Sequence, residues 1–372
     1  MDRSFLGDYI SSAIEASRND FIDNYDVRRF GPDSTLVRGN FRWVRDSYYF
    51  LLKKLNLVSE IEAKILTNKA VAHVAPHIID FEWLYKRLED DESRKFLVDV
   101  QLYKALGERR VKLPLNNKDY WAKIETAEKL ASGAESMELG FMGWKAYKMS
   151  LNSIGYPLQL FLPPLGVVHS LLLQPYRCQT VDSVIEVSEG DIVIDAGGCY
   201  GETALDFALK AGGTGQVFSF EFMPENLAVF HRNMQLNPNV AQRVKLIEKP
   251  LWEHSGEKLY IVGSGPGTRV RFDTTDPDAR RVETISIDDL VHDLSLAKLD
   301  FIKMDIEGAE LQALKGAEKS IRQFRPKMAI SIYHKPEDFW TIPQYIAGLG
   351  LGYRFALRHF TIHSEETVLF AF

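Results

Sequence analysis

The chain has 372 residues, 45% of them hydrophobic and 26% charged, and its 45 lysines and arginines against 51 aspartates and glutamates give a net charge of −6. This composition is typical of a globular protein, and the length is typical of about two domains. The mild acidity argues against the broad positive field that nucleic-acid binding requires, so we expect no nucleic-acid partner. Cys178 and Cys199 are too few for a disulfide framework or a structural zinc site.

The N-terminal and the most apolar segments give no sign of export or of membrane insertion. Residues 1–20 carry early acidic side chains and lack the uninterrupted apolar core of a signal peptide. The most apolar stretch, Leu158 to Tyr176, is interrupted by Pro163, Pro164, His169 and Gln174. It is therefore not expected to cross a bilayer as one helix. We expect a cytoplasmic protein without a membrane span.

The first part of the sequence, residues 1–134, is rich in charges and has a helical pattern. Phe81, Leu84, Tyr85 and Leu88, for example, fall on one face of a helix. Core packing explains this apolar face better than a cofactor site does. We expect residues 1–134 to form a helical domain, and the sequence leaves open whether it caps a site, recognises a substrate or forms a homo-oligomer.

In the second part, residues 135–372, strand and helix patterns alternate. Amphipathic helices are predicted at Glu202–Ala211 and Pro224–Leu236. Such alternation is typical of an open, doubly wound α/β sheet, in which ligands bind beyond the carboxyl ends of the strands. The predicted strands are 158–162, 167–173, 191–195, 216–221, 244–249, 299–305, 327–333, 353–358 and 367–372.

The strongest candidate site is a glycine turn that follows a buried strand, in the sequence Asp-Ala-Gly-Gly-Cys-Tyr-Gly-Glu at 195–202. Gly197, Gly198 and Gly201 lack side chains, so the backbone can approach a ligand closely. The helix that begins at Glu202 offers free N–H groups. A turn of this kind is typical of sites for nucleotide-like cofactors, although it is a weak signal by itself.

Two acidic residues sharpen the choice of cofactor. Asp195 ends the first strand, where a carboxylate suits a cofactor with a cationic amino-acid end and repels a pyrophosphate. Glu221 ends the next strand, where a carboxylate accepts hydrogen bonds from both hydroxyls of a ribose. Both positions fit S-adenosylmethionine, whereas NAD explains Glu221 and leaves Asp195 unexplained. We favour S-adenosylmethionine and keep an NAD-dependent oxidoreductase as the weaker alternative.

Later strands bring a third group of candidates to the same edge of the sheet. Lys303 and Asp305 alternate onto one face of their strand, and we expect an ion pair between them because a buried lysine needs a partner. Asp305 is explained equally well as a helix N-cap. His334 and His359 follow two further strands, and His334 is the stronger candidate of the two.

Five segments of the second part, taken in order, resemble the FkbM-like family of S-adenosylmethionine-dependent methyltransferases. They are VIDAGGCYGET at 193–203, FSFEFMPEN at 218–226, SIDDL at 286–290, DFIKMDIEGAE at 300–310 with LKGA after it, and the terminal ETVLFAF. The resemblance covers residues 135–372. It is most specific in the ordered combination of the glycine turn, SIDDL and KMDIEGAE.

The resemblance implies a class I methyltransferase fold and methyl transfer to a hydroxyl of a small molecule, such as a sugar, a glycoside or another secondary metabolite. N- or C-methyl transfer on the same fold stays open as an alternative. By analogy with the fold, Leu251 and Trp252 flank the adenine of the donor. The implied donor site comprises Asp195, Gly197, Gly198, Gly201, Glu202, Glu221, Phe222, Leu251, Trp252 and Asp305.

Methyl transfer to an alcohol needs a base within hydrogen-bond reach of the acceptor. We expect His334 to be this base, with Asp305 second and Lys303 third, because a lysine must first lose its own proton. A divalent metal held by Asp305 and other oxygen ligands is an alternative way to acidify the hydroxyl. The sequence shows no ligand set that decides the matter.

Overall fold

The computed structural model describes residues 3–21, 24, 26, 28, 57–139, 143–262, 269–271 and 280–372. It divides into two compact units: Met1–Asn117 with Thr361–Ser364, and Lys118–Phe360 with Glu365–Phe372. The division therefore falls before the joint expected near residue 134. Residues 29–56, which belong to the predicted helical part, lie outside the described residues. No helix among those described is long and apolar enough to cross a membrane.

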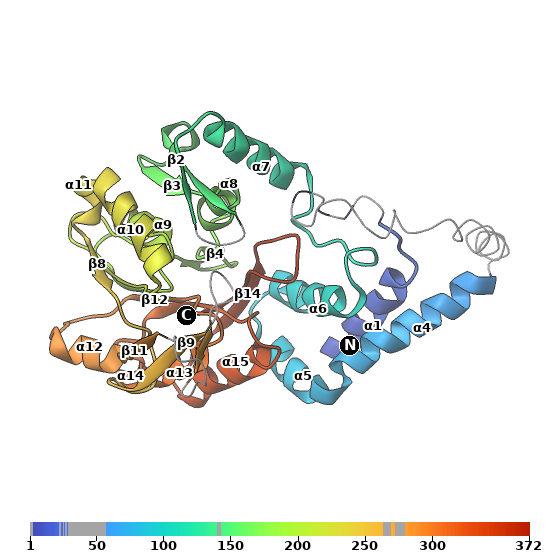
Figure 1. Cartoon of the computed structure of the whole chain (residues 1–372). Coiled ribbons are helices and arrows are strands. Elements are labelled where there is room, and N and C mark those ends of the chain that lie inside the picture. The colour runs from blue at the N-terminus through green and yellow to red at the C-terminus, as the bar shows by residue number, and fades with distance from the viewer. Residues whose placement is uncertain are drawn as a thin grey trace. The chain divides into compact units, whose positions relative to one another are not determined.

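The first unit is built from helices, which confirms a helical N-terminal region. Its predicted apolar face is part of the core, because Phe81, Leu84, Tyr85 and Leu88 are all buried. Phe5 stacks on Phe81, with the ring centroids 5.2 Å apart. The elements of this unit are α1 (Phe5–Ala16), α4 (Leu57–Val74), η2 (Ala75–His77), α5 (Ile78–Arg87) and α6 (Asp91–Leu106), and Figure 1 labels the four α-helices.

A seven-stranded sheet, in the order β14-β15-β13-β12-β6-β7-β8, forms the centre of the second unit. Its strands are β6 (Ile192–Ala196), β7 (Gln216–Phe220), β8 (Val244–Ile247), β12 (Phe301–Met304), β13 (Lys327–Ser331), β14 (Phe355–His359) and β15 (Thr367–Ala371). Neighbours from β8 to β13 are parallel, whereas β15 is antiparallel to both β13 and β14. All seven strands confirm predictions from the sequence. The central ones are apolar runs because helices bury them on both faces.

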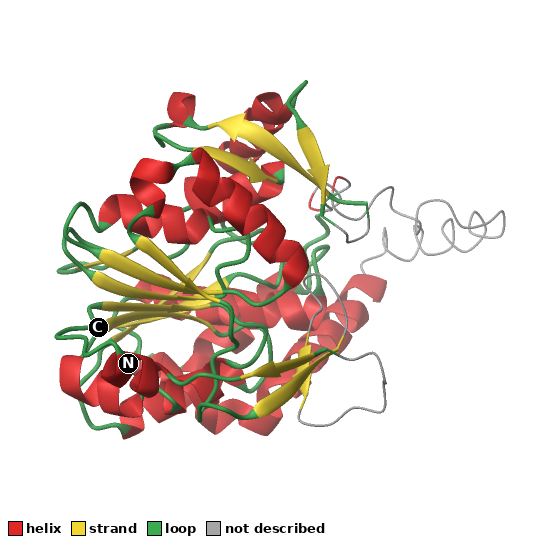
Figure 2. Ribbon diagram, turned by 60° about the vertical axis from the view of Figure 1, so that its left-hand side comes forward, coloured by secondary structure: helices red, strands yellow, loops and turns green. Residues whose placement is uncertain are grey.

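Helices cover the two faces of this sheet, as Figure 2 shows. On one side lie α9 (Glu202–Lys210), α10 (Pro224–Leu236) and α11 (Pro238–Ala241), and on the other lie α12 (Ile287–Asp293), α13 (Glu310–Lys315), α14 (Glu318–Phe324) and α15 (Asp338–Gly348). The strand order reverses between the neighbours β6 and β12. In a doubly wound sheet, the carboxyl ends of such a pair mark the ligand site. The predicted α/β fold is thereby confirmed.

Smaller elements complete the second unit, and one of them corrects a prediction. The segment expected as a strand at 167–173 instead forms a helical turn, because Pro164 begins a helix and Val167, Val168 and Leu171 are buried at helical spacing. These elements are α7 (Lys118–Ala131), β1 (Ser136–Glu138), β2 (Lys145–Ser150), η3 (Asn152–Ile154), β3 (Gln159–Leu162), α8 (Pro164–Gly166), η4 (Val167–Leu172), β4 (Cys178–Gln179), β5 (Val184–Ile185), β9 (Lys258–Val262), β10 (Arg269–Arg271) and β11 (Arg281–Glu283).

Candidate active site

A cavity of about 320 Å³ lies in the second unit, where β6, β7 and β12 end. This volume is typical of a small-molecule site. Its wall includes six of the predicted donor-binding residues: Gly197, Glu202, Glu221, Phe222, Leu251 and Asp305. Lys303 lies in the wall too. The wall does not include Asp195, Gly198, Gly201, Trp252 or the predicted base His334.

The glycine turn after β6 is shaped by the close approach of two loops. Gly197 has a φ of +83°, and a Cβ there would lie 2.0 Å from the carbonyl oxygen of Asp305. A Cβ at Gly198 would lie 2.2 Å from Oγ of Ser219. Both contacts are too short for any side chain. These two glycines are therefore required for the packing of the strand ends, and Gly197 also lines the cavity.

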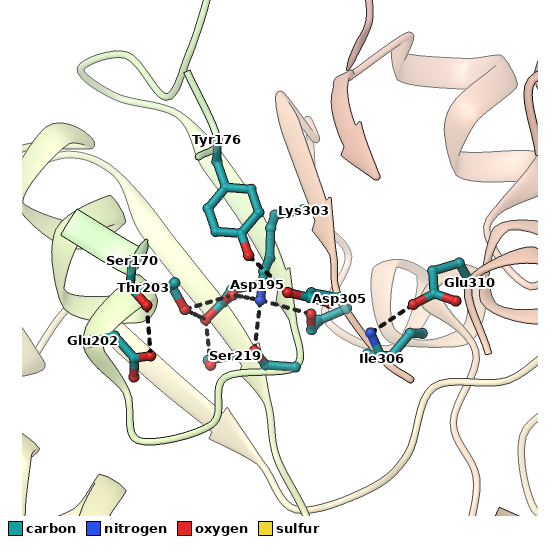
Figure 3. A network of polar contacts seen from close by, with 12 residues as sticks. Ser170, Tyr176, Asp195, Glu202, Thr203, Ser219, Lys303, Asp305, Ile306 and Glu310 are labelled. Carbon is teal, nitrogen blue, oxygen red and sulfur yellow. Dashed lines mark hydrogen bonds and ion pairs between the residues drawn. The ribbon is translucent and has the colours of Figure 1, made fainter. Parts of the chain in front are cut away.

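Asp195 lies beneath this turn, where its side chain is fully enclosed. It accepts hydrogen bonds from the hydroxyls of Thr203 at 3.1 Å and Ser219 at 2.8 Å. Nζ of Lys303 lies 3.2 Å from its Oδ1. Figure 3 shows this network. Asp195 thus holds the turn through these three partners, and its predicted contact with a cofactor stays a prediction.

Lys303 pairs with Asp195 and not with Asp305, which corrects the expected ion pair. The reason is the register of the sheet, in which Lys303 and Asp195 are direct neighbours on adjacent strands. Nζ of Lys303 also donates to the carbonyl oxygens of Ala196 at 3.1 Å and Gly197 at 2.6 Å. Burial disfavours the charged amine, but the carboxylates of Asp195 and Asp305 outweigh it and raise the pKa of Lys303. A lysine that keeps its proton cannot act as a base.

Glu221, at the end of β7, presents an oriented carboxylate to the cavity. Its Oε1 accepts hydrogen bonds from the backbone N–H groups of Phe222 at 2.7 Å and Met223 at 2.8 Å, and its Oε2 accepts one from the side chain of Asn226 at 3.0 Å. Burial raises the pKa of Glu221, although these donors favour the charged form. Oε1 uses both of its lone pairs on the two N–H groups, whereas Oε2 accepts one of these hydrogen bonds and retains a lone pair that suits a ribose hydroxyl.

Glu202, at the start of α9, gives the cavity wall a buried acceptor without a donor. Its Oε1 accepts a hydrogen bond from the hydroxyl of Ser170 at 3.2 Å, whereas its Oε2 has no hydrogen-bond partner among the described residues. Burial raises the pKa of Glu202 to about 7. A buried oxygen of this kind is costly until it is paired. It fits an ammonium group, such as the one at the amino-acid end of S-adenosylmethionine.

The loop after β12 joins Asp305 to two tyrosines and a glutamate in the same wall. The hydroxyl of Tyr176 donates to Oδ2 of Asp305, and that of Tyr333 to Oδ1, both at 3.1 Å. The Tyr333 hydroxyl also lies 3.4 Å from Oε1 of Glu366. Neither tyrosine nor Glu366 was predicted from the sequence. The available signals were the position of Tyr333 beside His334 at a strand end and that of Glu366 just before the last strand.

The protonation states in this group are set by burial and by neighbouring charge. Burial, followed by the charge of Asp305, raises the pKa of Glu366 to about 8. The same two causes hold the pKa values of Tyr176 and Tyr333 well above the ordinary value, so both phenols stay protonated. A carboxyl group that titrates near neutral pH is suited to general base catalysis. Glu366 therefore joins Asp305 as a candidate base.

His334 lies away from the cavity wall, among carboxylates. Its Nε2 is 3.3 Å from Asp305 and 3.7 Å from Glu307, and its Nδ1 is 2.9 Å from Glu310. Burial disfavours the charged ring, but these acids outweigh it and raise the pKa of His334 to about 9. A ring that is charged at neutral pH does not accept a proton. The geometry favours Asp305 and Glu366 over His334 as the direct base.

The remaining candidates divide between the cavity wall and the core. Leu251 and Phe222 line the cavity together and offer an apolar surface for an adenine. Trp252 packs with its backbone against α13, since a Cβ at Gly316 would lie 2.2 Å from its carbonyl oxygen. His359 is buried, with Nδ1 2.9 Å from the hydroxyl of Thr367. Its position at the sheet edge thus serves packing.

Comparisons with known proteins agree with this geometry. The model of the methyltransferase FkbM domain matches residues 195–355. The crystal structure of methyltransferase FkbM from Methylobacillus flagellatus KT is similar, with a TM-score of 0.50 and 21% sequence identity. The match covers 84% of this chain and 65% of that one, so the chain spans less than two thirds of that protein. None of the curated proteins matches significantly.

Two other solved methyltransferases are less similar. Aeropyrum pernix fibrillarin, solved with bound S-adenosyl-L-methionine, is 13% identical with a TM-score of 0.35, covering 65% of this chain and 84% of that one. Precorrin-6y C5,15-methyltransferase from Geobacter metallireducens GS-15 is 12% identical with a TM-score of 0.34, covering 55% of this chain and 87% of that one.

The strand order and the glycine turn are those of a class I methyltransferase fold. Residues 195–355 match the model of the methyltransferase FkbM domain, the family that the sequence motifs resemble. The resemblance seen in the sequence motifs is thereby confirmed.

Proposed function

We propose that the chain transfers the methyl group of S-adenosylmethionine to a hydroxyl of a small molecule, such as a sugar, a glycoside or another secondary metabolite. One observation carries the proposal. The same cavity wall holds Glu202 and Glu221, which suit the donor, and the carboxyl groups of Asp305 and Glu366, which the hydroxyl of Tyr333 links. The second pair suits removal of a proton from an alcohol.

The charge of the cavity wall favours a cationic donor. Its acids are Glu202, Glu221, Glu225, Asp305, Glu307 and Glu366, against the two lysines Lys249 and Lys303. This excess of carboxyl groups disfavours the pyrophosphate of NAD, so an oxidoreductase stays the weaker alternative. The donor, when bound, supplies a methyl group on a positively charged sulfur.

Each part of the donor has a matching group in the wall. Glu202 offers its unpaired oxygen to the ammonium, and Glu221 offers its oriented carboxylate to the ribose. Phe222 and Leu251 offer apolar surface to the adenine. Asp195 and its partners act indirectly, because they hold the glycine turn in the conformation that brings Gly197 to the cavity.

The acceptor hydroxyl becomes a better nucleophile as its proton leaves. Tyr333 has one hydroxyl proton and two carboxyl neighbours, so its hydrogen bond to Asp305 leaves Glu366 to accept the proton of the acceptor. The charged ring of His334, 3.3 Å from Asp305, stabilises the carboxylate of Asp305. Transfer to an uncharged amine would need no such base, and this difference separates O-methylation from N-methylation.

The wider setting of the enzyme stays a prediction from the sequence. We propose a cytoplasmic enzyme without a nucleic-acid partner. The helical residues 1–134 would cap the site, recognise the acceptor or form a homo-oligomer.

The first test is calorimetric titration of the full chain with S-adenosylhomocysteine and, separately, with NAD. We expect S-adenosylhomocysteine to bind, and Glu221→Ala to weaken it by about 1.5 to 3 kcal/mol through loss of charge-assisted hydrogen bonds. Glu283→Gln, a change of an exposed acid on β11, is the matched control and should leave the affinity unchanged. Binding of NAD without binding of S-adenosylhomocysteine would overturn the proposal.

Acceptor screening then follows with a labelled methyl donor, beginning with glycosides and hydroxylated metabolites. A labelled product that is an ether supports transfer to oxygen. A product labelled on nitrogen or carbon would replace this part of the proposal, while the donor site would stand.

A further inference from the structure

Three side chains of types that bind metal ions meet at the carboxyl edge of the sheet. They are Asp305 after β12, Glu310 at the start of α13 and His334 after β13. One ligand atom from each lies within 4.8 Å of those of the other two. Three separate elements therefore converge on one small volume.

Two of these side chains are more than nine-tenths buried and carry polar atoms without a hydrogen bond. The side chain of Glu310 is 0% exposed, and its Oε2 has no hydrogen-bond partner among the described residues, whereas Oε1 accepts the N–H of Ile306 at 2.8 Å. His334 is 7% exposed, and neither ring nitrogen makes a hydrogen bond of suitable geometry within the described part of the chain. Buried polar atoms in this condition are rare and need an explanation.

The surroundings of the three residues are strongly acidic. Glu307 lies 3.7 Å from Nε2 of His334 on the same side as Asp305. Such a concentration of carboxylates attracts a cation more strongly than any single carboxylate would.

We propose that Asp305, Glu310 and His334 bind a divalent metal ion. Two carboxylates and one imidazole are donors for an ion of intermediate hardness, such as Mn²⁺. The ion would supply the partner that Oε2 of Glu310 lacks, and it would take the place of a proton on the His334 ring, because only a neutral imidazole nitrogen binds a metal.

The inference rests on the proposed function and deepens it. Asp305 also belongs to the cavity wall, so an ion bound there would lie next to the acceptor, where it would favour loss of the hydroxyl proton. Glu366, which is outside the ligand set, would then remain free to take that proton.

The test is titration of the full chain with MnCl₂ after treatment with a chelator, without donor or acceptor, with free Mn²⁺ followed by electron paramagnetic resonance. We expect saturable binding that Glu310→Gln and His334→Asn each weaken by about tenfold or more. Glu283→Gln, which removes an exposed charge on β11, should bind Mn²⁺ like the unchanged chain.

Titration of the same proteins with S-adenosylhomocysteine separates loss of the metal site from misfolding. If His334→Asn also loses binding of S-adenosylhomocysteine, it is misfolded, and the Mn²⁺ titration of the isosteric Glu310→Gln decides whether the metal site exists. Absence of saturable Mn²⁺ binding, or equal weakening by Glu283→Gln, overturns the metal site. If the unchanged chain binds S-adenosylhomocysteine but not Mn²⁺, the methyltransferase proposal still stands. If the unchanged chain does not bind S-adenosylhomocysteine, that result counts against the methyltransferase proposal and not against the metal site.

Discussion

Two sets of carboxyl groups in the cavity wall, Glu221 on one side and Asp305 with Glu366 on the other, differ in their hydrogen-bond partners. Glu221 accepts three hydrogen bonds from backbone and amide groups, which orient its carboxyl group. Asp305 and Glu366 instead share the hydroxyl of Tyr333 and lie in one another's field. The first arrangement suits steady binding of a donor, and the second suits movement of a proton.

The same residue type thus takes different roles because its neighbours differ. Around Glu221 the neighbours are donors, which stabilise the anion. Around Glu366 the neighbouring carboxylate of Asp305 and burial destabilise the anion and raise the pKa to about 8. Removal of the carboxyl group of Glu366 should therefore affect catalysis, whereas removal of the carboxyl group of Glu221 should affect donor binding.

The largest expected effect belongs to Glu366→Gln, which removes the candidate base but keeps the shape of the side chain. We expect methyl transfer to a hydroxyl to slow by about a hundredfold or more, because general base catalysis contributes this much. Binding of S-adenosylhomocysteine should stay near normal. The measurement is the rate of transfer at saturating donor, compared with its binding in a calorimeter.

The pH profile sharpens the same prediction. In the unchanged chain the rate should rise as the pH increases through about 8, because Glu366 then loses its proton and becomes able to accept another. In Glu366→Gln this rise should be absent. A variant with full activity and an unchanged profile would leave Asp305 as the base.

A smaller effect is expected at the donor end, from the pH dependence of binding. The pKa of Glu202 is about 7 in the free protein, so the carboxylate that suits an ammonium is present above this pH and is lost as the pH falls. We expect the affinity for S-adenosylhomocysteine to fall as the pH drops below about 7, by at most about tenfold per unit. Calorimetry between about pH 5.5 and about pH 7.5 measures it.

Glu202→Gln provides the control for this dependence, because an amide does not titrate. Its affinity should be lower than that of the unchanged chain near neutral pH and nearly flat with pH. If Glu202→Gln keeps the full pH dependence of the affinity, another group in the cavity wall causes that dependence. Glu202 would then not be the residue that binds the ammonium group.

The position of Glu202 and Glu221 in the cavity wall was predictable from the sequence for a physical reason. Glu202 and Glu221 each stand at the junction of an element with a loop, within a short motif whose local geometry follows from the glycines and the strand pattern. The strands of the main sheet were predictable as well, because six of the seven are mostly buried and only the edge strand β8 is partly exposed. Contiguous signals of this kind need no knowledge of tertiary contacts.

The other end was not predictable, because its residues come from separate elements. Tyr176 precedes the whole sheet, Tyr333 follows β13, and Glu366 precedes β15. They meet because β13 and β15 pair in an antiparallel register that sequence patterns do not fix. The same limit explains the error at Lys303, whose partner Asp195 depends on the pairing of β6 with β12.

The last expected effect concerns the stability of the fold beneath the glycine turn. Ser219→Ala removes the 2.8 Å hydrogen bond to the buried carboxylate of Asp195, which keeps Thr203 and Lys303 as partners. We expect the free energy of unfolding in urea to fall by about 1 to 2 kcal/mol. Ser331→Ala is a matched control, because Ser331 ends β13, is equally buried and has an Oγ without a hydrogen-bond partner among the described residues. Removing an unpaired hydroxyl should cost little or should stabilise the fold, so equal losses in both variants would contradict a specific role for the Ser219 hydroxyl.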